Sequence, residues 1–230
     1  MTQSEWRREW IDRKCEIALA LQSGVANSSY GDAVLILCAA ISAMAAEVWP
    51  GKGIDHARFV ELLVRFGSVD CASATISIPL LIQALKEDGQ IHKSSAVRRK
   101  FVTNDFSRIL TGHEVDKSEA VIVAACPSMK KIWLREFSYS SLLYKEVRSP
   151  YSHEYRLGER ADNWPMTSDD KAGVSYVNRI TDNGVKRLIH FRVEWMIGMA
   201  LSIAENLRLQ ALPLPPPNNW WIQKPKNWPQ

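Results

Sequence analysis

The chain has 230 residues, of which 46% are hydrophobic and 23% are charged, and its formal net charge is +4. A chain of this length and composition can bury one substantial core, which excludes a disordered protein and a bundle of membrane spans. The positive charge is compatible with a nucleic-acid partner but is too small to require one. We expect one globular domain over residues 1–210 and a Pro/Trp-rich tail over residues 211–230.

Hydrophobic periodicity predicts four helices in the first part of the chain. The first spans Ser4–Gln22 and is expected to bury its bulky apolar positions, Trp6, Trp10, Ile17 and Leu21. The second is apolar all round over Ala33–Ala46, so we expect it at the centre of the core. This apolar run is shorter than the roughly 18–20 residues that cross a bilayer. Two further helices are expected over Asp55–Phe66 and Pro79–Asp88.

The stretch from Gly89 to Asp116 is basic and poorly periodic, and we expect a loop with one short helix over residues 104–110. At its centre, Arg98, Arg99 and Lys100 directly precede the aromatic Phe101. Clustered cations beside an aromatic ring are the groups that hold phosphates and bases, so these three cations are candidate RNA-binding residues. A solvated basic loop is the alternative interpretation.

Further along the chain, helices are expected over residues 117–126 and 129–147. Two strands, Val174–Thr181 and Val185–Phe191, flank Asn183 and Gly184, a residue pair typical of two-residue hairpin loops. That loop would pair Tyr176 with Phe191 and Asn178 with Ile189. A last helix over residues 193–209 is expected to turn Trp195, Met199 and Ile203 inward. The proline-rich tail that follows favours an extended conformation, and it either packs on its own domain or contacts a partner.

One motif carries chemistry, the segment from Arg148 to His153 at the end of a predicted helix. Pro150 would clash with the carbonyl of Glu146 in a continuous helix, so we expect a break there, with Ser149 as the cap of a new turn. On an unbroken helix, side chains five residues apart point about 140° away from each other, whereas a break lets them converge. A guanidinium holds phosphate oxygens and an imidazole transfers protons near neutral pH. The pair therefore suits metal-free phosphodiester cleavage.

In this motif and in its helical pattern over most of residues 1–210, the chain resembles the HEPN superfamily of helical nucleotide-binding and ribonuclease domains. Ribonuclease members carry Arg, four to six residues and then His near a helix end. The resemblance implies a mainly α helical bundle with one late β-hairpin, which forms a homodimer and cuts RNA without a metal. Arg148 and His153 would be the catalytic pair. Members usually have Asn, Asp or His directly after the Arg, where this chain has Ser149 and Pro150.

Such proteins commonly act in prokaryotic defence or toxin–antitoxin systems, so the resemblance implies RNA, a second copy of the chain and an antitoxin or assembly component as partners. Several alternatives stay open. A second match, Arg108 and His113, lies in the basic stretch and is an alternative functional pair. Arg148 and His153 could instead form an ordinary surface helix end. The chain could also be a non-catalytic module that binds a nucleotide or a protein, or a structural assembly subunit.

We expect no metal and no cofactor, because no Cys or His residues lie at the close spacing typical of structural metal sites. The four cysteines are scattered and are expected to be buried thiols, which fits a reducing compartment: Cys15, Cys38, Cys71 and Cys126. The charged N-terminal segment lacks the apolar run of a secretory signal. The sequence therefore predicts a cytoplasmic protein without membrane contact.

Overall fold

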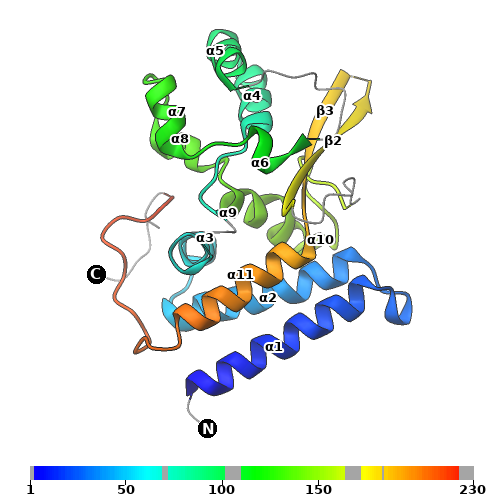
Figure 1. The fold of residues 1–230 in the computed structure, drawn as a ribbon, viewed down its shortest axis with the longest axis vertical. Helices are drawn as coiled ribbons and strands as arrows, with labels where there is room; N and C mark the ends of the chain where they lie inside the picture. Colours follow the sequence, from blue (N-terminus) through cyan, green and yellow to red (C-terminus); the bar gives the residue numbers. More distant parts are fainter. Residues whose placement is uncertain (1–2, 69–71, 102–109, 164–171, 183, 223–230) are drawn as a thin grey trace.

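The structure is a computed structural model, and it describes residues 3–68, 72–101, 110–163, 172–182 and 184–222. Within these residues the protein is mainly helical and carries one small antiparallel sheet, which confirms the predicted mainly α composition. In Figure 1, three long helices, α1, α2 and α11, lie side by side, and the shorter helices and the hairpin lie beyond one side of them.

The helices of the first half are α1 (Gln3–Gln22), the 3-10 turn η1 (Val25–Asn27), α2 (Tyr30–Val48), α3 (Asp55–Phe66), α4 (Ile78–Glu87) and α5 (Ile91–Phe101). The second half contains β1 (Leu110–Thr111), α6 (Gly112–Val115), α7 (Glu119–Ala125), α8 (Lys131–Arg135), α9 (Tyr139–Leu142), the π-helix η2 (Leu143–Arg148), α10 (Ser149–Glu154), β2 (Val174–Thr181), β3 (Gly184–Phe191) and α11 (Val193–Asn206).

The central helix is α2, which α1, α3 and α11 contact. It begins three residues before the apolar run, because Ser29 and Asp32 form a capping box in which Ser29 N donates to Asp32 Oδ2 at 2.8 Å.

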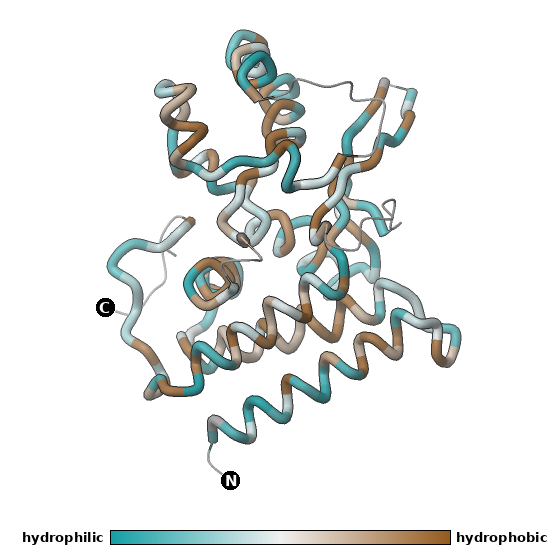
Figure 2. The backbone as a smooth tube through the Cα atoms, in the orientation of Figure 1, coloured by the Kyte–Doolittle hydropathy of each residue, from teal (hydrophilic) through white to brown (hydrophobic). Residues whose placement is uncertain are grey.

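Hydrophobic residues recur along α1, α2 and α11, where these helices meet (Figure 2). With 19 residues, α2 extends beyond the apolar run and is long and apolar enough to cross a membrane by length and composition, and 56% of its apolar window is buried inside the fold. Its central position in the core is confirmed.

The buried face of α1 differs from the predicted one. Ile11 and Ala18 are completely buried, whereas Trp6 is 56% exposed and Ile17 is 41% exposed. The smaller side chains lie between α1 and its two neighbouring helices, and Trp6 lies beside this contact and stacks on Trp10 with ring centroids 6.0 Å apart. The prediction followed the 3- to 4-residue spacing of Trp6, Trp10, Ile17 and Leu21, but close helix packing selects side chains that fit between two backbones.

The basic stretch forms a helix, α5, where we had expected a loop. Its buried positions are Ser94 and Val97, and Ser94 Oγ donates to the carbonyl of Ile82 in α4 at 3.2 Å. Two buried positions are too few to produce a clear hydrophobic period, and packing on α4 stabilises the helix instead. The short helix predicted over residues 104–110 falls on positions outside the described residues, except Leu110, which belongs to β1.

The single helix predicted over residues 129–147 is divided into α8, α9 and η2. The division follows from a tertiary contact with the segment before α4. Ser77 N donates to the carbonyl of Phe137 at 2.9 Å, and Tyr139 N donates to the carbonyl of Thr75 at 3.0 Å. These bonds form an isolated antiparallel β-bridge between Ile76 and Ser138, so the residues between α8 and α9 are not helical.

The predicted break at Pro150 is absent. Arg148 and Ser149 both have right-handed helical dihedral angles, and η2 continues directly into α10. Because proline has no N–H, the carbonyl of Glu146 loses its helical donor. In this fold Gly158 N donates to that carbonyl at 2.7 Å. The helix therefore continues through the proline because a later segment supplies the missing hydrogen bond.

The hairpin forms where the sequence predicted it, but in a different register. Asn178 pairs with Arg187, and Thr181 pairs with Gly184, so Gly184 belongs to the strand and the loop consists of residues 182 and 183. Residue 183 itself lies outside the described residues. The shift is two residues, which leaves each side chain on its predicted face of the sheet. β1 adds a third antiparallel strand next to β2.

The described part of the tail, up to residue 222, packs on its own domain. Leu214 N donates to the carbonyl of Val48 at 3.0 Å, and Trp220 is buried with its ring 5.6 Å from that of Trp49. Trp221 N also bonds the carboxylate of Glu61 in α3. The tail therefore completes the main hydrophobic cluster.

Candidate functional site

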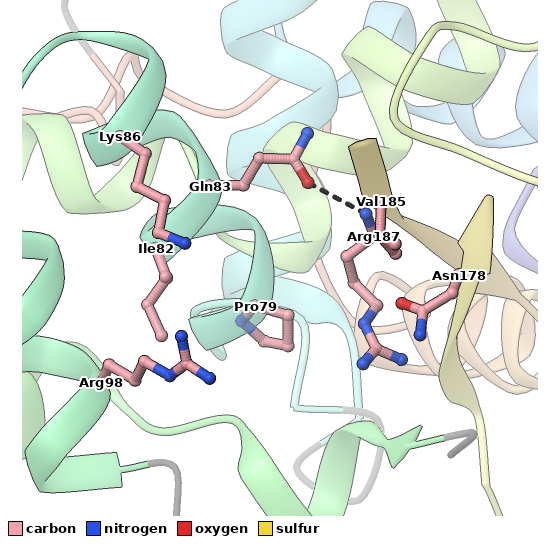
Figure 3. Close-up of a pocket in the computed structure, with 8 residues that line it drawn as sticks. All are labelled: Pro79, Ile82, Gln83, Lys86, Arg98, Asn178, Val185 and Arg187. Atoms are coloured by element: carbon pink, nitrogen blue, oxygen red, sulfur yellow. Dashed lines mark hydrogen bonds between the residues drawn. The ribbon is translucent and has the colours of Figure 1, made fainter. Parts of the chain in front are cut away.

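A cavity of about 220 Å³ lies between α4, α5 and the β2–β3 hairpin. Figure 3 shows that side chains from the two helices and from the two strands point into the same space. The lining residues are Pro79, Ile82, Gln83, Lys86, Arg98, Asn178, Val185 and Arg187. The site therefore joins two consecutive helices to a hairpin that lies far from them in the sequence.

The cavity is strongly cationic. Lys86 of α4, Arg98 of α5 and Arg187 of β3 line it, and no acidic residue is among the described side chains that form its wall. Glu87, next to Lys86, is not a lining residue, and its carboxylate accepts from Arg160 at 2.7 Å and from Gln83 Nε2 at 3.0 Å. An anion in this cavity would be attracted by three positively charged side chains.

Arg187 is the most buried of the three cations, with 5% of its surface exposed. The strand holds it against α4, because Arg187 N donates to Gln83 Oε1 at 3.0 Å. Its cross-strand partner Asn178 adds an amide to the same wall. Burial lowers the pKa of the Arg187 guanidinium from its ordinary value. An arginine stays charged at neutral pH despite such a shift, so a positive charge is held at low solvent exposure.

The helices on the other wall are positioned by local sequence. Ser77 caps α4 with its side chain, which accepts from Leu80 N, and Pro79 stands in the first turn. Gly89 has a φ of +71°, a left-handed conformation that suits glycine, and it reverses the chain into α5. The two helices pack on each other, and each contributes a cation to the cavity wall, Lys86 from α4 and Arg98 from α5.

The cavity has the chemistry of a phosphate site. Guanidinium groups bind phosphate oxygens through two parallel hydrogen bonds, and lysine adds a point charge. Its volume is below the roughly 300–1,000 Å³ of pockets that enclose a whole small molecule. A single phosphate group with part of its sugar therefore fits this space better than a complete cofactor does.

The structure separates the three predicted RNA-binding residues. At about 100° per residue, Arg98 lies about 70° from the centre of the buried face of α5, whereas Arg99 points almost directly away from that face. Arg98 accordingly lines the cavity, and Arg99 and Lys100 are exposed on the outside of the helix. The cavity thus contains one of the three predicted cations together with two that the sequence did not indicate.

Arg148 lies in η2 and contacts α2 rather than His153. Its Nε donates to Ser42 Oγ at 3.3 Å, and its guanidinium lies 5.1 Å from the ring centroid of Tyr144. His153 is exposed on α10, and none of the hydrogen bonds among the described residues involves it. On a continuous helix the two side chains diverge, so the convergence expected from a break at Pro150 is not observed.

The other histidines of interest are His113, which forms the alternative pair with Arg108, and the half-buried His56. Arg108 lies outside the described residues, and His113 is exposed on α6 with Nε2 3.4 Å from Thr111 Oγ1. His56 stacks on Tyr144 with ring centroids 4.4 Å apart, so it shares this ring with Arg148. Burial, followed by the charge of Lys145, lowers the pKa of His56 to about 4. His56 is therefore neutral at pH 7.

Three of the cysteines, Cys15, Cys38 and Cys126, are buried thiols, and Cys71 lies outside the described residues. Burial raises the pKa of Cys38 to about 12 and that of Cys15 to about 11, so neither is a reactive thiolate at neutral pH. Within the described ranges, no group of three His, Cys, Asp or Glu side chains is placed to hold a metal ion.

Sequence reasoning missed Lys86, Gln83, Asn178 and Arg187. Lys86 and Gln83 lie three residues apart and therefore on one face of α4, and a correct hairpin register would have paired Asn178 with Arg187. No local signal indicated that the hairpin packs on α4. The site is therefore a product of tertiary packing.

Comparison of the chain with protein-family models, with curated proteins and with solved structures finds no match. The resemblance to the HEPN superfamily accordingly rests on the Arg148 and His153 motif and on the helical pattern alone.

Proposed function

We propose that this protein binds RNA and that the cavity between α4, α5 and β3 holds a backbone phosphate. The observation that carries the proposal is the convergence of Lys86, Arg98 and Arg187 on one small cavity. A phosphate there would accept hydrogen bonds from two guanidinium groups.

The charge beyond the cavity favours a polyanion over a free phosphate ion. α5 has the sequence IHKSSAVRRKF, which contains four Lys or Arg residues and no acidic residue. Arg99 and Lys100 extend the positive surface outward from the cavity, along the same helix. A nucleic-acid backbone repeats its negative charge at each nucleotide, so one strand can contact the cavity and the helix surface together.

The test compares two neighbouring arginines. Binding of a fluorescently labelled ten-nucleotide RNA is measured by anisotropy, from low to physiological salt, for the wild type, Arg98→Gln and Arg99→Gln. We expect Arg98→Gln to weaken binding about tenfold and to reduce the salt slope by about 0.7–0.9. Arg99→Gln removes the same charge outside the cavity, and we expect a clearly smaller effect. Equal effects of the two variants would show that the cavity does not hold the phosphate, and no RNA binding by the wild type would overturn the whole proposal.

Metal-independent RNA cleavage is a second candidate function. The observation in its favour is that Arg148 and His56 share the Tyr144 ring, so the fold holds a guanidinium and a neutral imidazole in one cluster. His153 stays the predicted partner of Arg148. The test incubates single-stranded RNA in excess EDTA with the wild type, His153→Ala and His56→Ala, and circular dichroism checks that each protein is folded. The variant that loses cleavage identifies the catalytic histidine. Binding without cleavage would favour the non-catalytic module.

The homodimer, the antitoxin or assembly partner and the role in prokaryotic defence stay predictions from the resemblance. Sedimentation velocity over a tenfold range of protein concentration tests the homodimer. A monomer at every concentration would exclude a cleavage site shared between two subunits.

A further inference from the structure

A second cavity lies on the opposite flank of α5, between the start of this helix and α8. Its volume is about 230 Å³, and its lining residues are Gln90, Lys93, Ser128, Met129, Lys130 and Trp133. Lys93 lies about 70° from the centre of the buried face of α5, on the side opposite to Arg98. The same helix therefore presents one cation to each cavity.

The lining of this second cavity differs from that of the first. It combines two lysines with one aromatic ring, that of the half-buried Trp133, and with the polar side chains of Gln90 and Ser128. Trp133 is held in place by Phe137, with ring centroids 5.0 Å apart. In the described part of the chain no acidic side chain pairs with Lys93 or Lys130, and Lys93 Nζ bonds Gln90 Oε1 at 2.9 Å.

We infer that the second cavity is a base-binding subsite for single-stranded RNA, in which an unpaired base contacts Trp133 and its phosphate contacts Lys93 and Lys130. This inference rests on the proposed RNA binding at the first cavity. An indole ring offers a π-face to any base, and lysines beside it hold the backbone, which is how proteins bind single strands. The bases of a duplex are paired and stacked, so they do not reach a side chain in a cavity of this kind.

The two cavities together suggest the path of the strand. Lys93 and Arg98 are separated by about 7.5 Å along the axis of α5, and a helix with its side chains is about 10 Å wide. A strand that fills both cavities must therefore cross α5, and a mononucleotide cannot fill both. Affinity is expected to rise steeply with the length of the RNA until both cavities are occupied, because the second contact becomes intramolecular.

The experiment uses the full chain and three labelled ligands, namely a ten-nucleotide single-stranded RNA, the same sequence as a blunt duplex, and the corresponding single-stranded DNA. The variants are Trp133→Leu, Lys130→Gln and, as a matched control, Lys131→Gln, since Lys131 neighbours Lys130 but lies outside the cavity and near Glu119. We expect Trp133→Leu to weaken single-strand binding about tenfold and duplex binding less than twofold. Lys130→Gln should reduce the single-strand salt slope by about 0.7, and Lys131→Gln should not.

The outcomes separate this inference from the proposed function. If Arg98→Gln weakens RNA binding but Trp133→Leu and Lys130→Gln do not, the second subsite is wrong and the first cavity stands. If no variant binds differently from the wild type, or the wild type binds no RNA, both ideas fail. Equal losses for duplex and single strand would also overturn the base-binding role. If Trp133→Leu unfolds the chain, the comparison of Lys130→Gln with Lys131→Gln decides by itself whether the second cavity binds the strand. Tighter binding of DNA than of RNA would overturn the assignment of RNA as the ligand.

Discussion

At the scale of single residues, the most unusual ionisable group is Asp116, which is buried between α4, α9 and β2. Its Oδ1 accepts from Ile78 N at 2.9 Å, and its Oδ2 accepts from the hydroxyl groups of Tyr139 and Tyr176. Burial raises the pKa of Asp116 to about 7, although these hydrogen bonds and the charge of Lys117 act in the opposite direction. The folded protein therefore favours the protonated carboxyl relative to the unfolded chain.

This shift predicts how stability depends on pH. The carboxyl has a pKa of about 4 when unfolded and about 7 when folded, so its stabilising contribution is lost as pH rises through this window. Asp116→Asn imitates the neutral carboxyl. We expect the free energy of unfolding of the wild type to fall, relative to that of the variant, by on the order of 2 kcal/mol between pH 5 and pH 8. Urea unfolding at both pH values measures this, and parallel pH profiles would contradict it.

At the scale of elements, the continuous helix through Pro150 depends on a glycine outside it. Gly158 N satisfies the carbonyl of Glu146, and the backbone of Arg160 donates to the Glu146 carboxylate at 3.1 Å. A Cβ on residue 158 would lie 3.0 Å from Glu146 Cα and 3.2 Å from its carbonyl oxygen. There is thus no room for a side chain where the loop meets the helix.

Gly158→Ala is therefore expected to destabilise the protein by about 1–3 kcal/mol, because the loop must move away and the carbonyl of Glu146 loses its donor. Thermal or urea unfolding measures the loss. The neighbouring exposed residue gives a control, Glu159→Ala, for which we expect a change within about 0.5 kcal/mol. If Gly158→Ala is as stable as the wild type, Pro150 is accommodated without the hydrogen bond from Gly158 N to the carbonyl of Glu146.

At the scale of the whole molecule, the tail joins elements that are distant in sequence. Trp220 is 5% exposed against Trp49 at the end of α2. Arg135 of α8 lies over the ring of Trp221, 4.5 Å from its centroid, and bonds the carbonyl of the same residue at 3.2 Å. The tail thereby connects the long helices with α8, next to the second cavity.

Two tryptophans test this connection. Trp220→Ala is expected to lower the free energy of unfolding by about 3–5 kcal/mol, the usual cost of deleting a buried indole. Trp6→Ala removes the same side chain from a 56% exposed position, and we expect it to cost less than about 1 kcal/mol. Urea unfolding followed by far-ultraviolet circular dichroism provides the comparison. Similar effects of the two substitutions would show that the tail does not stabilise the core.

The sequence by itself determined the elements whose signals are local. The apolar run of α2, the approximate extents of α3 and α4 and the hairpin between residues 174 and 191 were all predicted, because hydrophobic period, caps and turn residues act within a few positions. Only the tertiary structure decided the rest. α5 forms because α4 covers it, η2 continues through Pro150 because Gly158 replaces its hydrogen bond, and Arg187 meets Lys86 and Arg98 because the hairpin packs on α4. These outcomes depend on contacts between residues far apart in the chain, which no local pattern specifies.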